Sequence, residues 1–166
     1  GITHEVRSTA GSVENVKLLS DASSGVSVAL VQGGIANAND LPGAVSLGRV
    51  TLEPLWIFYR ANKYYDSLVQ LRGKRLAVSK EGSGTRMLAK TLLEANSALQ
   101  GTTLLPLSGM DAIMALATGQ ADAIFFVLAP NAKLVSDALR NPSFRLMNLV
   151  QADAISRLFP YLQKVV

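Results

Sequence analysis

Strand-like and helix-like segments alternate along the chain, and this alternation limits the fold more than any other feature. Short apolar runs rich in β-branched residues are followed by segments whose apolar residues repeat at helical spacing. This order predicts an α/β fold with mostly parallel strands covered by helices. We expect strands over residues 5–9, 26–31, 44–50, 55–59, 75–79, 103–107, 123–128 and 144–150, and helices near 13–21, 85–99, 108–118, 134–139 and 153–159. For the helix over residues 108–118, Ser108 is the expected N-cap and Gly119 the expected C-terminal glycine.

Composition excludes several classes of protein and of site. Of the 166 residues, 49% are hydrophobic and 17% charged, which is typical of a globular chain. Cysteine is absent and His4 is the one histidine, so disulfides, zinc–thiolate sites and thiol nucleophiles are excluded, and a histidine-based triad is disfavoured. No acidic pair stands at catalytic spacing. We therefore expect no catalytic residue, no metal and no cofactor, and a chain that is not an enzyme.

The excess positive charge lies in residues 60–90, which carry a net charge of +6. Residues 1–59 carry a net charge of −2, and the net charge of residues 91–166 is zero. Such a stretch attracts anions, although it is equally consistent with a solvated face of one lobe. The basic residues do not form one helical stripe and no nucleic-acid recognition module is visible. A nucleic-acid partner is therefore not expected.

Two turns between a strand and a helix consist of small residues: Thr9-Ala10-Gly11-Ser12 and Gly82-Ser83-Gly84-Thr85-Arg86. In an open α/β sheet, turns at the carboxyl ends of strands bind ligands. A helix N-terminus there offers unpaired N–H groups and a partial positive charge to a carboxylate or phosphate. The alternative is that Ser12 and Thr85 only cap their helices.

Other candidate motifs are weaker. The Walker loop and the dinucleotide fingerprint both fail, because Arg75 follows Gly73-Lys74 and Met87 stands where a third glycine is needed. Gln32 ends an apolar strand, and its amide must be paired either by the fold or by a ligand. Phe126 belongs to an aromatic pair that is more often core than ligand contact.

The motifs taken together resemble the TAXI family of solute-binding proteins of TRAP transporters, which have the type II periplasmic-binding-protein fold. The resemblance spans nearly the whole chain. Its motifs are Thr9-Ala10-Gly11-Ser12-Val13-Glu14-Asn15, Leu30-Val31-Gln32-Gly33, Glu53-Pro54-Leu55, Leu71-Arg72-Gly73-Lys74-Arg75, Gly82-Ser83-Gly84-Thr85-Arg86 and Gly119-Gln120-Ala121-Asp122-Ala123-Ile124-Phe125-Phe126.

The resemblance implies a two-lobed clamshell of two mostly parallel sheets flanked by helices. Residues 1–59 and 151–166 would form a partial first lobe, and residues 60–150 the second. The cleft would bind a small organic anion or an amino acid for a TRAP-type importer in the periplasm or another extracytoplasmic space, with the membrane permease subunits as partners. The implied ligand-binding residues are Gly11, Ser12, Gln32, Ser83, Gly84, Thr85, Arg86 and Phe126.

The chain departs from the family pattern in two ways. Ala10 stands where a second glycine is usual. In the family a strand and a glycine-rich loop precede the position of residue 1, and the first lobe continues beyond residue 166. We therefore expect a first lobe that is incomplete at both ends, whose exposed apolar surface favours self-association. A ligand-sensing effector domain of a regulator with the same fold remains the alternative function.

Overall fold

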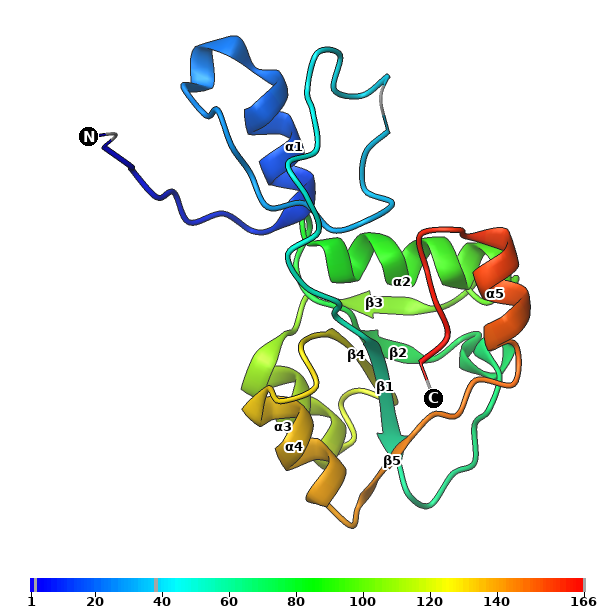
Figure 1. The fold of residues 1–166 in the computed structure, drawn as a ribbon. Coiled ribbons are helices and arrows are strands. Elements are labelled where there is room, and N and C mark those ends of the chain that lie inside the picture. The colour runs from blue at the N-terminus through cyan, green and yellow to red at the C-terminus, as the bar shows by residue number, and fades with distance from the viewer. Residues whose placement is uncertain (2, 38, 166) are drawn as a thin grey trace.

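A computed structural model describes residues 1, 3–37 and 39–165. Ile2, Ala38 and Val166, which the sequence assigns to the first lobe, lie outside the described residues. Figure 1 shows the elements in chain order: α1 (Ser12–Ser20), η1 (Ala22–Ser24), β1 (Leu55–Arg60), η2 (Leu68–Leu71), β2 (Arg75–Ala77), α2 (Gly84–Ala95), β3 (Thr103–Leu105), α3 (Gly109–Thr118), β4 (Ala123–Val127), α4 (Lys133–Arg140), β5 (Phe144–Leu146) and α5 (Ala152–Leu158).

The described residues form one mixed sheet of five strands in the order β3-β2-β4-β1-β5. Strand β2 is parallel to β3 and β4, whereas β1 is antiparallel to β4 and β5. The predicted α/β class is confirmed. The expectation of two mostly parallel sheets is wrong for this part of the chain, which contains a single sheet with two antiparallel ladders.

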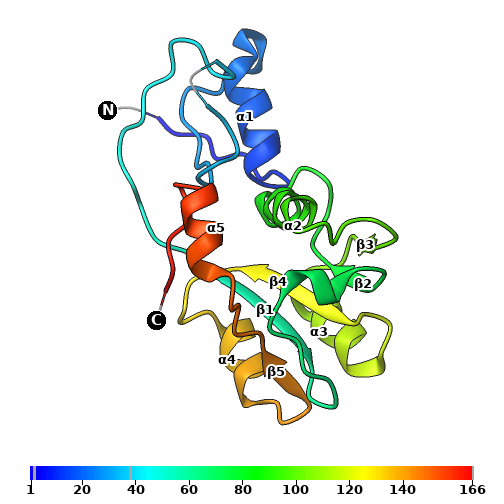
Figure 2. The same ribbon diagram turned by 90° about the vertical axis from the view of Figure 1, so that its right-hand side faces the viewer.

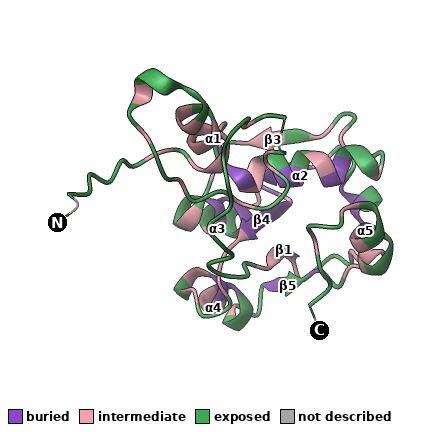
Figure 3. Ribbon diagram, turned by 45° about the horizontal axis from the view of Figure 1, so that its top comes forward, coloured by how far each residue is buried: buried purple, intermediate pink, exposed green. Residues whose placement is uncertain are grey.

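Alternating residues of the central strands face two separate hydrophobic cores, as the two-residue period of a strand requires. Ile57 of β1 and Phe125 of β4 belong to the core beneath α2, whereas Phe58 and Phe126 belong to the core beneath α3 and α4. Figures 1 and 2 show α2 on one face of the sheet and α3 and α4 on the other. Buried residues concentrate in these layers (Figure 3). This burial on both faces explains the apolar run of residues 123–127.

Helix α2 is amphipathic and places Leu88, Ala89, Leu92 and Leu93 in the core. Ser83 is its N-cap, and the hydroxyl of Ser83 accepts a hydrogen bond from the backbone N–H of Arg86. The turns around α3 are only partly as predicted. Gly119 ends this helix in the left-handed conformation, as expected, but the hydroxyl of the N-cap residue Ser108 makes no capping hydrogen bond.

Three predicted strands, over residues 5–9, 26–31 and 44–50, do not form. These segments lie in no ladder of the described chain, and most of their apolar side chains are exposed. A strand is stable only when a neighbour pairs with its N–H and C=O groups, and the local apolar pattern does not supply that neighbour. The large exposed side chains of these segments and their flanks are Val6, Val28, Leu30, Val31, Val45, Leu47, Val50 and Leu52.

The predicted division into lobes at residue 60 stays a prediction. Strand β1, on the first-lobe side of that boundary, pairs with β4 over residues 55–59 and 123–127. Ile155 of α5 packs into the core beneath α2. Among the described residues, no helix is long and apolar enough to cross a bilayer.

Candidate functional site

The two glycine-containing turns singled out in the sequence are in direct contact. The backbone N–H of Val13, in the first turn of α1, donates to the carbonyl oxygen of Gly82 at 3.1 Å. Gly11 has φ of 133°, and a Cβ at this position would lie 3.2 Å from the Cα of Ser83. Only glycine permits both this backbone conformation and this close approach. An anion would therefore lie beside the contact of the two turns rather than between them.

Four backbone N–H groups at the start of α1 and α2 have no hydrogen-bond partner within the described residues. They belong to Ser12 and Glu14 of α1 and to Gly84 and Thr85 of α2. The first turn of a helix leaves such donors unpaired and carries a partial positive charge. Two such termini joined at one point form a surface that favours a carboxylate, sulfonate or phosphate.

Gln32 joins this contact from a third segment. The hydroxyl of Ser12 accepts a hydrogen bond from the backbone N–H of Gln32 at 3.0 Å. The side chain of Gln32 lies against the backbone of Gly84, where a Cβ would overlap its amide oxygen. The structure thus brings Ser12, Gln32 and Gly84 together.

Ser83 and Arg86 are already engaged by their own chain. Ser83 is buried, with 8% exposed surface, and its hydroxyl accepts the backbone N–H of Arg86 at 3.2 Å. The Arg86 guanidinium lies 2.7 Å from a carboxylate oxygen of Glu81 and donates to the carbonyl of Ser79 at 3.3 Å. Thr85 is partly buried, and its hydroxyl has no hydrogen-bond partner among the described residues. The N-caps are therefore Gly11 for α1 and Ser83 for α2, so the capping interpretation of Ser12 and Thr85 is wrong.

A hollow of about 210 Å³ adjoins the contact on the side of α2 that carries Arg86. Val13 of α1 and Leu104 of β3 supply apolar walls, and Arg86 and Lys90 supply positive charge. The complete lining is Val13, Glu81, Gly82, Ser83, Arg86, Met87, Lys90 and Leu104.

Phe126 is the implied ligand-binding residue that the structure does not bring to the turns. Its side chain is 5% exposed and packs in the core beneath α3 and α4, with Phe58 and Ile124. Helix α2, which begins at the turns, covers the opposite face of the sheet. The alternative interpretation of Phe126 as a core residue therefore matches its position.

Sequence reasoning missed three residues that shape the site. Glu81 pairs with Arg86, and a carboxylate oxygen of Glu14 accepts the N–H of Ala10 at 2.6 Å. The role of Glu14 was predictable from the sequence, because an acid at the third helical position commonly accepts a backbone N–H from the residues just before the helix. Tyr161, by contrast, has no local signal. Its ring lies on the Gly33-Gly34 turn next to Gln32, at a position that a Cβ on Gly34 would fill.

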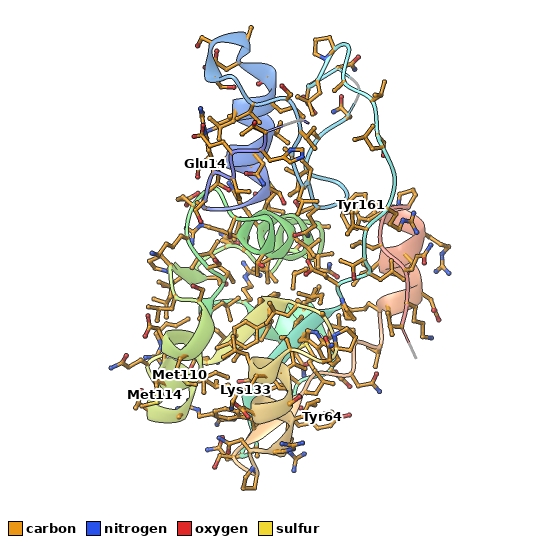
Figure 4. The ribbon with its side chains drawn as sticks, turned by 60° about the vertical axis from the view of Figure 1, so that its left-hand side comes forward. Glu14, Tyr64, Met110, Met114, Lys133 and Tyr161 are labelled. Carbon is orange, nitrogen blue, oxygen red and sulfur yellow. The ribbon has the colours of Figure 1, made fainter. Side chains whose placement is uncertain are left out.

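Figure 4 shows Glu14 on α1 and Tyr161 on the C-terminal segment, on two sides of the molecule above α2. Burial raises the pKa of Tyr161, since the phenolate would be poorly solvated beside the turn. Phe159 lies 5.9 Å from Tyr161, ring centroid to ring centroid, and packs on the core beneath α2. The C-terminal segment therefore links the Gly33-Gly34 turn to the core.

A cluster of three charged side chains, Asp122, Arg75 and Arg60, lies away from these turns. Asp122 accepts hydrogen bonds from the backbone N–H and the guanidinium of Arg75 at 2.9 and 3.1 Å, and Arg60 lies 3.4 Å away. Burial alone would raise the pKa of Asp122, but the hydrogen bonds from Arg75 and the charges of Arg75 and Arg60 together lower it. Within the described residues, no group of three His, Cys, Asp or Glu side chains is placed to hold a metal ion.

The profile of the NMT1-like family matches residues 1–166. Among solved structures, the periplasmic aliphatic sulphonate binding protein SsuA from Escherichia coli is 23% identical, with a TM-score of 0.49, over 62% of this chain and 33% of that chain. The alkanesulfonate-binding protein SsuA from Xanthomonas axonopodis pv. citri bound to MOPS is 31% identical, with a TM-score of 0.44, over 56% and 31%. An ancestral arginine-binding protein bound to arginine is 20% identical, with a TM-score of 0.45, over 58% and 41%.

Two of these similar structures are sulphonate-binding proteins and the third is an arginine-binding protein. The chain spans between 31% and 41% of their length. The comparison with curated proteins gave no match.

Proposed function

Because this chain belongs to the NMT1-like family, we propose that it binds a small organic anion or an amino acid where its two glycine-containing turns meet. The single observation that carries this proposal is the hydrogen bond from Val13 to Gly82, which joins two helix N-termini. The N–H groups of Ser12, Glu14, Gly84 and Thr85 are left free around this bond. An anion accepts such donors without the desolvation cost of burying a side-chain cation.

Side chains around the contact would complete the site. Thr85 brings a free hydroxyl, and Ser12 can still donate the proton of the hydroxyl that accepts from Gln32. Arg86 would add a charge-assisted hydrogen bond once it releases Glu81. No bond is made or broken in this function, so it needs no nucleophile or general base.

We further propose that this chain is part of an extracytoplasmic substrate-binding subunit of a TRAP-type importer. The order of motifs that resembles the TAXI family supports this assignment. Ligand capture would then proceed by closure of two lobes, and the closed form would be presented to the membrane permease subunits. Uptake by vesicles that contain the permease subunits, measured with and without the binding protein, tests this assignment.

The anion site itself is tested by NMR titration of the ¹⁵N-labelled chain with acetate, glutamate, sulfate and phosphate. We expect saturable shifts concentrated at the amides of Ser12, Glu14, Gly84 and Thr85. Thr85→Val should weaken binding by about tenfold, the loss of one hydrogen bond to a charged group. Thr118→Val, in the exposed last turn of α3, is the matched control and should leave the affinity unchanged. Saturable binding of none of these anions, or shifts confined to other segments, would exclude the site.

A further inference from the structure

The hollow beside the turns combines an apolar wall with two cationic side chains. Val13, Met87 and Leu104 line it with aliphatic carbon, and Arg86 and Lys90 stand one helical turn apart on the same side of α2. Its volume of about 210 Å³ is below the ~300–1,000 Å³ of pockets for drug-sized ligands, so the ligand must be small. Such a lining is complementary to a molecule with an anionic group at one end and a short hydrocarbon at the other.

A carboxylate of the chain itself occupies the cationic end of this hollow. Glu81 places an oxygen 2.7 Å from the Arg86 guanidinium, although its side chain is 85% exposed. The Arg86 side chain is only 18% exposed, so its charge is held near the hollow while its partner is free to move into water. Lys90 is held loosely, since its nearest acidic partner, Glu94, is 4.0 Å away. An exposed acid of this kind is readily exchanged for another carboxylate.

We propose that the hollow takes the alkyl end of a short aliphatic monocarboxylic acid, whose carboxylate replaces Glu81 at Arg86. This proposal rests on the proposed function, because it narrows the anion that binds beside the turns. Arginine forms paired, charge-assisted hydrogen bonds with a carboxylate, and the alkyl chain gains from leaving water along Val13, Met87 and Leu104. Glu81 thus stands in for the ligand when the ligand is absent.

The apolar half of the proposal is tested by calorimetric titration with acetate, butyrate and hexanoate. We expect the affinity to rise about twofold to fourfold for each added methylene, since full burial of a methylene is worth about fourfold. Met87→Gln keeps the length of the side chain but removes its apolar end, and should flatten this rise. Met110→Gln is the control, because Met110 is 55% exposed on α3 and does not line the hollow.

The charged half is tested with Glu81→Gln. This variant frees Arg86 without removing the side chain, and hexanoate should bind about fivefold more tightly. The control is Asp137→Asn on α4, which removes an acid of the same kind from its 2.6 Å ion pair with Lys133 and should leave the affinity unchanged. Circular dichroism of each variant confirms that the fold is retained before binding is compared.

The outcomes separate this inference from the proposed function. Equal affinity for acetate and hexanoate, with shifts at the turn amides, would overturn the aliphatic hollow and leave the anion site standing. Unchanged hexanoate affinity in Glu81→Gln would overturn the exchange at Arg86. Failure of every anion to bind would overturn both the hollow and the site.

Discussion

The carbonyl oxygen of Gly82 accepts the backbone N–H of Val13 at 3.1 Å, so the loop before α2 also caps α1. The loop before α2 thereby pairs with a backbone donor in the first turn of α1. The bond fixes the relative position of two N-termini that lie far apart in the sequence. The proposed anion site is consequently a property of the junction and not of either helix alone.

Substituting Gly11 should separate the two turns. Its φ of 133° and ψ of −159° lie in a region that is nearly restricted to glycine, and a Cβ would press on Ser83. We expect Gly11→Ala to cost about 1–3 kcal/mol in the free energy of unfolding and to abolish anion binding. Gly25→Ala is the control: it has φ of 72° but open space around it. Urea unfolding and titration should show that Gly25→Ala loses stability only.

Two substitutions of Ser83 distinguish its capping role from ligand binding. Ser83→Ala removes the acceptor of the Arg86 N–H and should destabilise α2 by about 1 kcal/mol. Ser83→Asp keeps a cap and adds a negative charge at the helix N-terminus, so it should retain stability while repelling an anion. Thermal unfolding and NMR titration of both variants check this. Anion affinity equal to wild type in Ser83→Asp would contradict the placement of the site.

Asp122 should contribute to the acid sensitivity of the fold. The pKa of its carboxyl is lowered in the folded state, so the stability it contributes is fully present above its unfolded pKa of about 3.8. That stability is lost as the pH falls through the lower, folded pKa. Urea unfolding between pH 2 and pH 7 should therefore show a weaker pH dependence below pH 4 in Asp122→Asn. A curve parallel to wild type would show that the pair with Arg75 does not control acid unfolding.

Phe126 should matter for stability rather than affinity. Its buried ring packs with Phe58 beneath α3 and α4, and Phe126→Ala should cost about 3–5 kcal/mol. Phe126→Leu keeps much of the volume and should cost less, leaving enough folded protein for titration. Wild-type anion affinity in Phe126→Leu is the expected result. A large loss of affinity in a folded variant would restore Phe126 to the ligand site.

Self-association should depend on the extended segment around residues 44–50. Val45 and Leu47 are 80% and 83% exposed, and their segment pairs with no strand of the described chain. Exposed strand-like segments of this kind favour pairing between molecules. Sedimentation velocity at increasing concentration should show association of the wild type and its loss in a Val45→Lys, Leu47→Lys double variant. Arg145→Lys, on β5, serves as a conservative control.

The sequence pattern predicted the elements that are packed against a sheet. The apolar run that became β4, the amphipathic residues of α2 and the glycine that ends α3 all carry their signal locally, and each is confirmed within a few residues. Residues 26–31 have an equally good local pattern but form no strand, because strand formation depends on a partner that lies elsewhere in space.

The candidate site was predictable only in part for the same reason. The small residues of the two turns are visible in the sequence, and the structure brings Gly11, Ser12, Gln32 and Gly84 together. Glu81 is one of several acidic residues in the sequence, and no spacing identifies it as the partner of Arg86. The position of Tyr161 depends on the path of the last helix and is invisible to any local pattern.

Through Tyr161, the C-terminal segment of the described chain helps to position the candidate site. Its ring bears on the Gly33-Gly34 turn, the turn follows Gln32, and Gln32 lies against Gly84 at the start of α2. Ile155 and Phe159 anchor the same segment in the core. The C-terminal segment therefore holds the Gly33-Gly34 turn in place. Cutting the chain after Phe159, or attaching a rigid tag there, would loosen the proposed ligand site, although that site lies far away in the sequence.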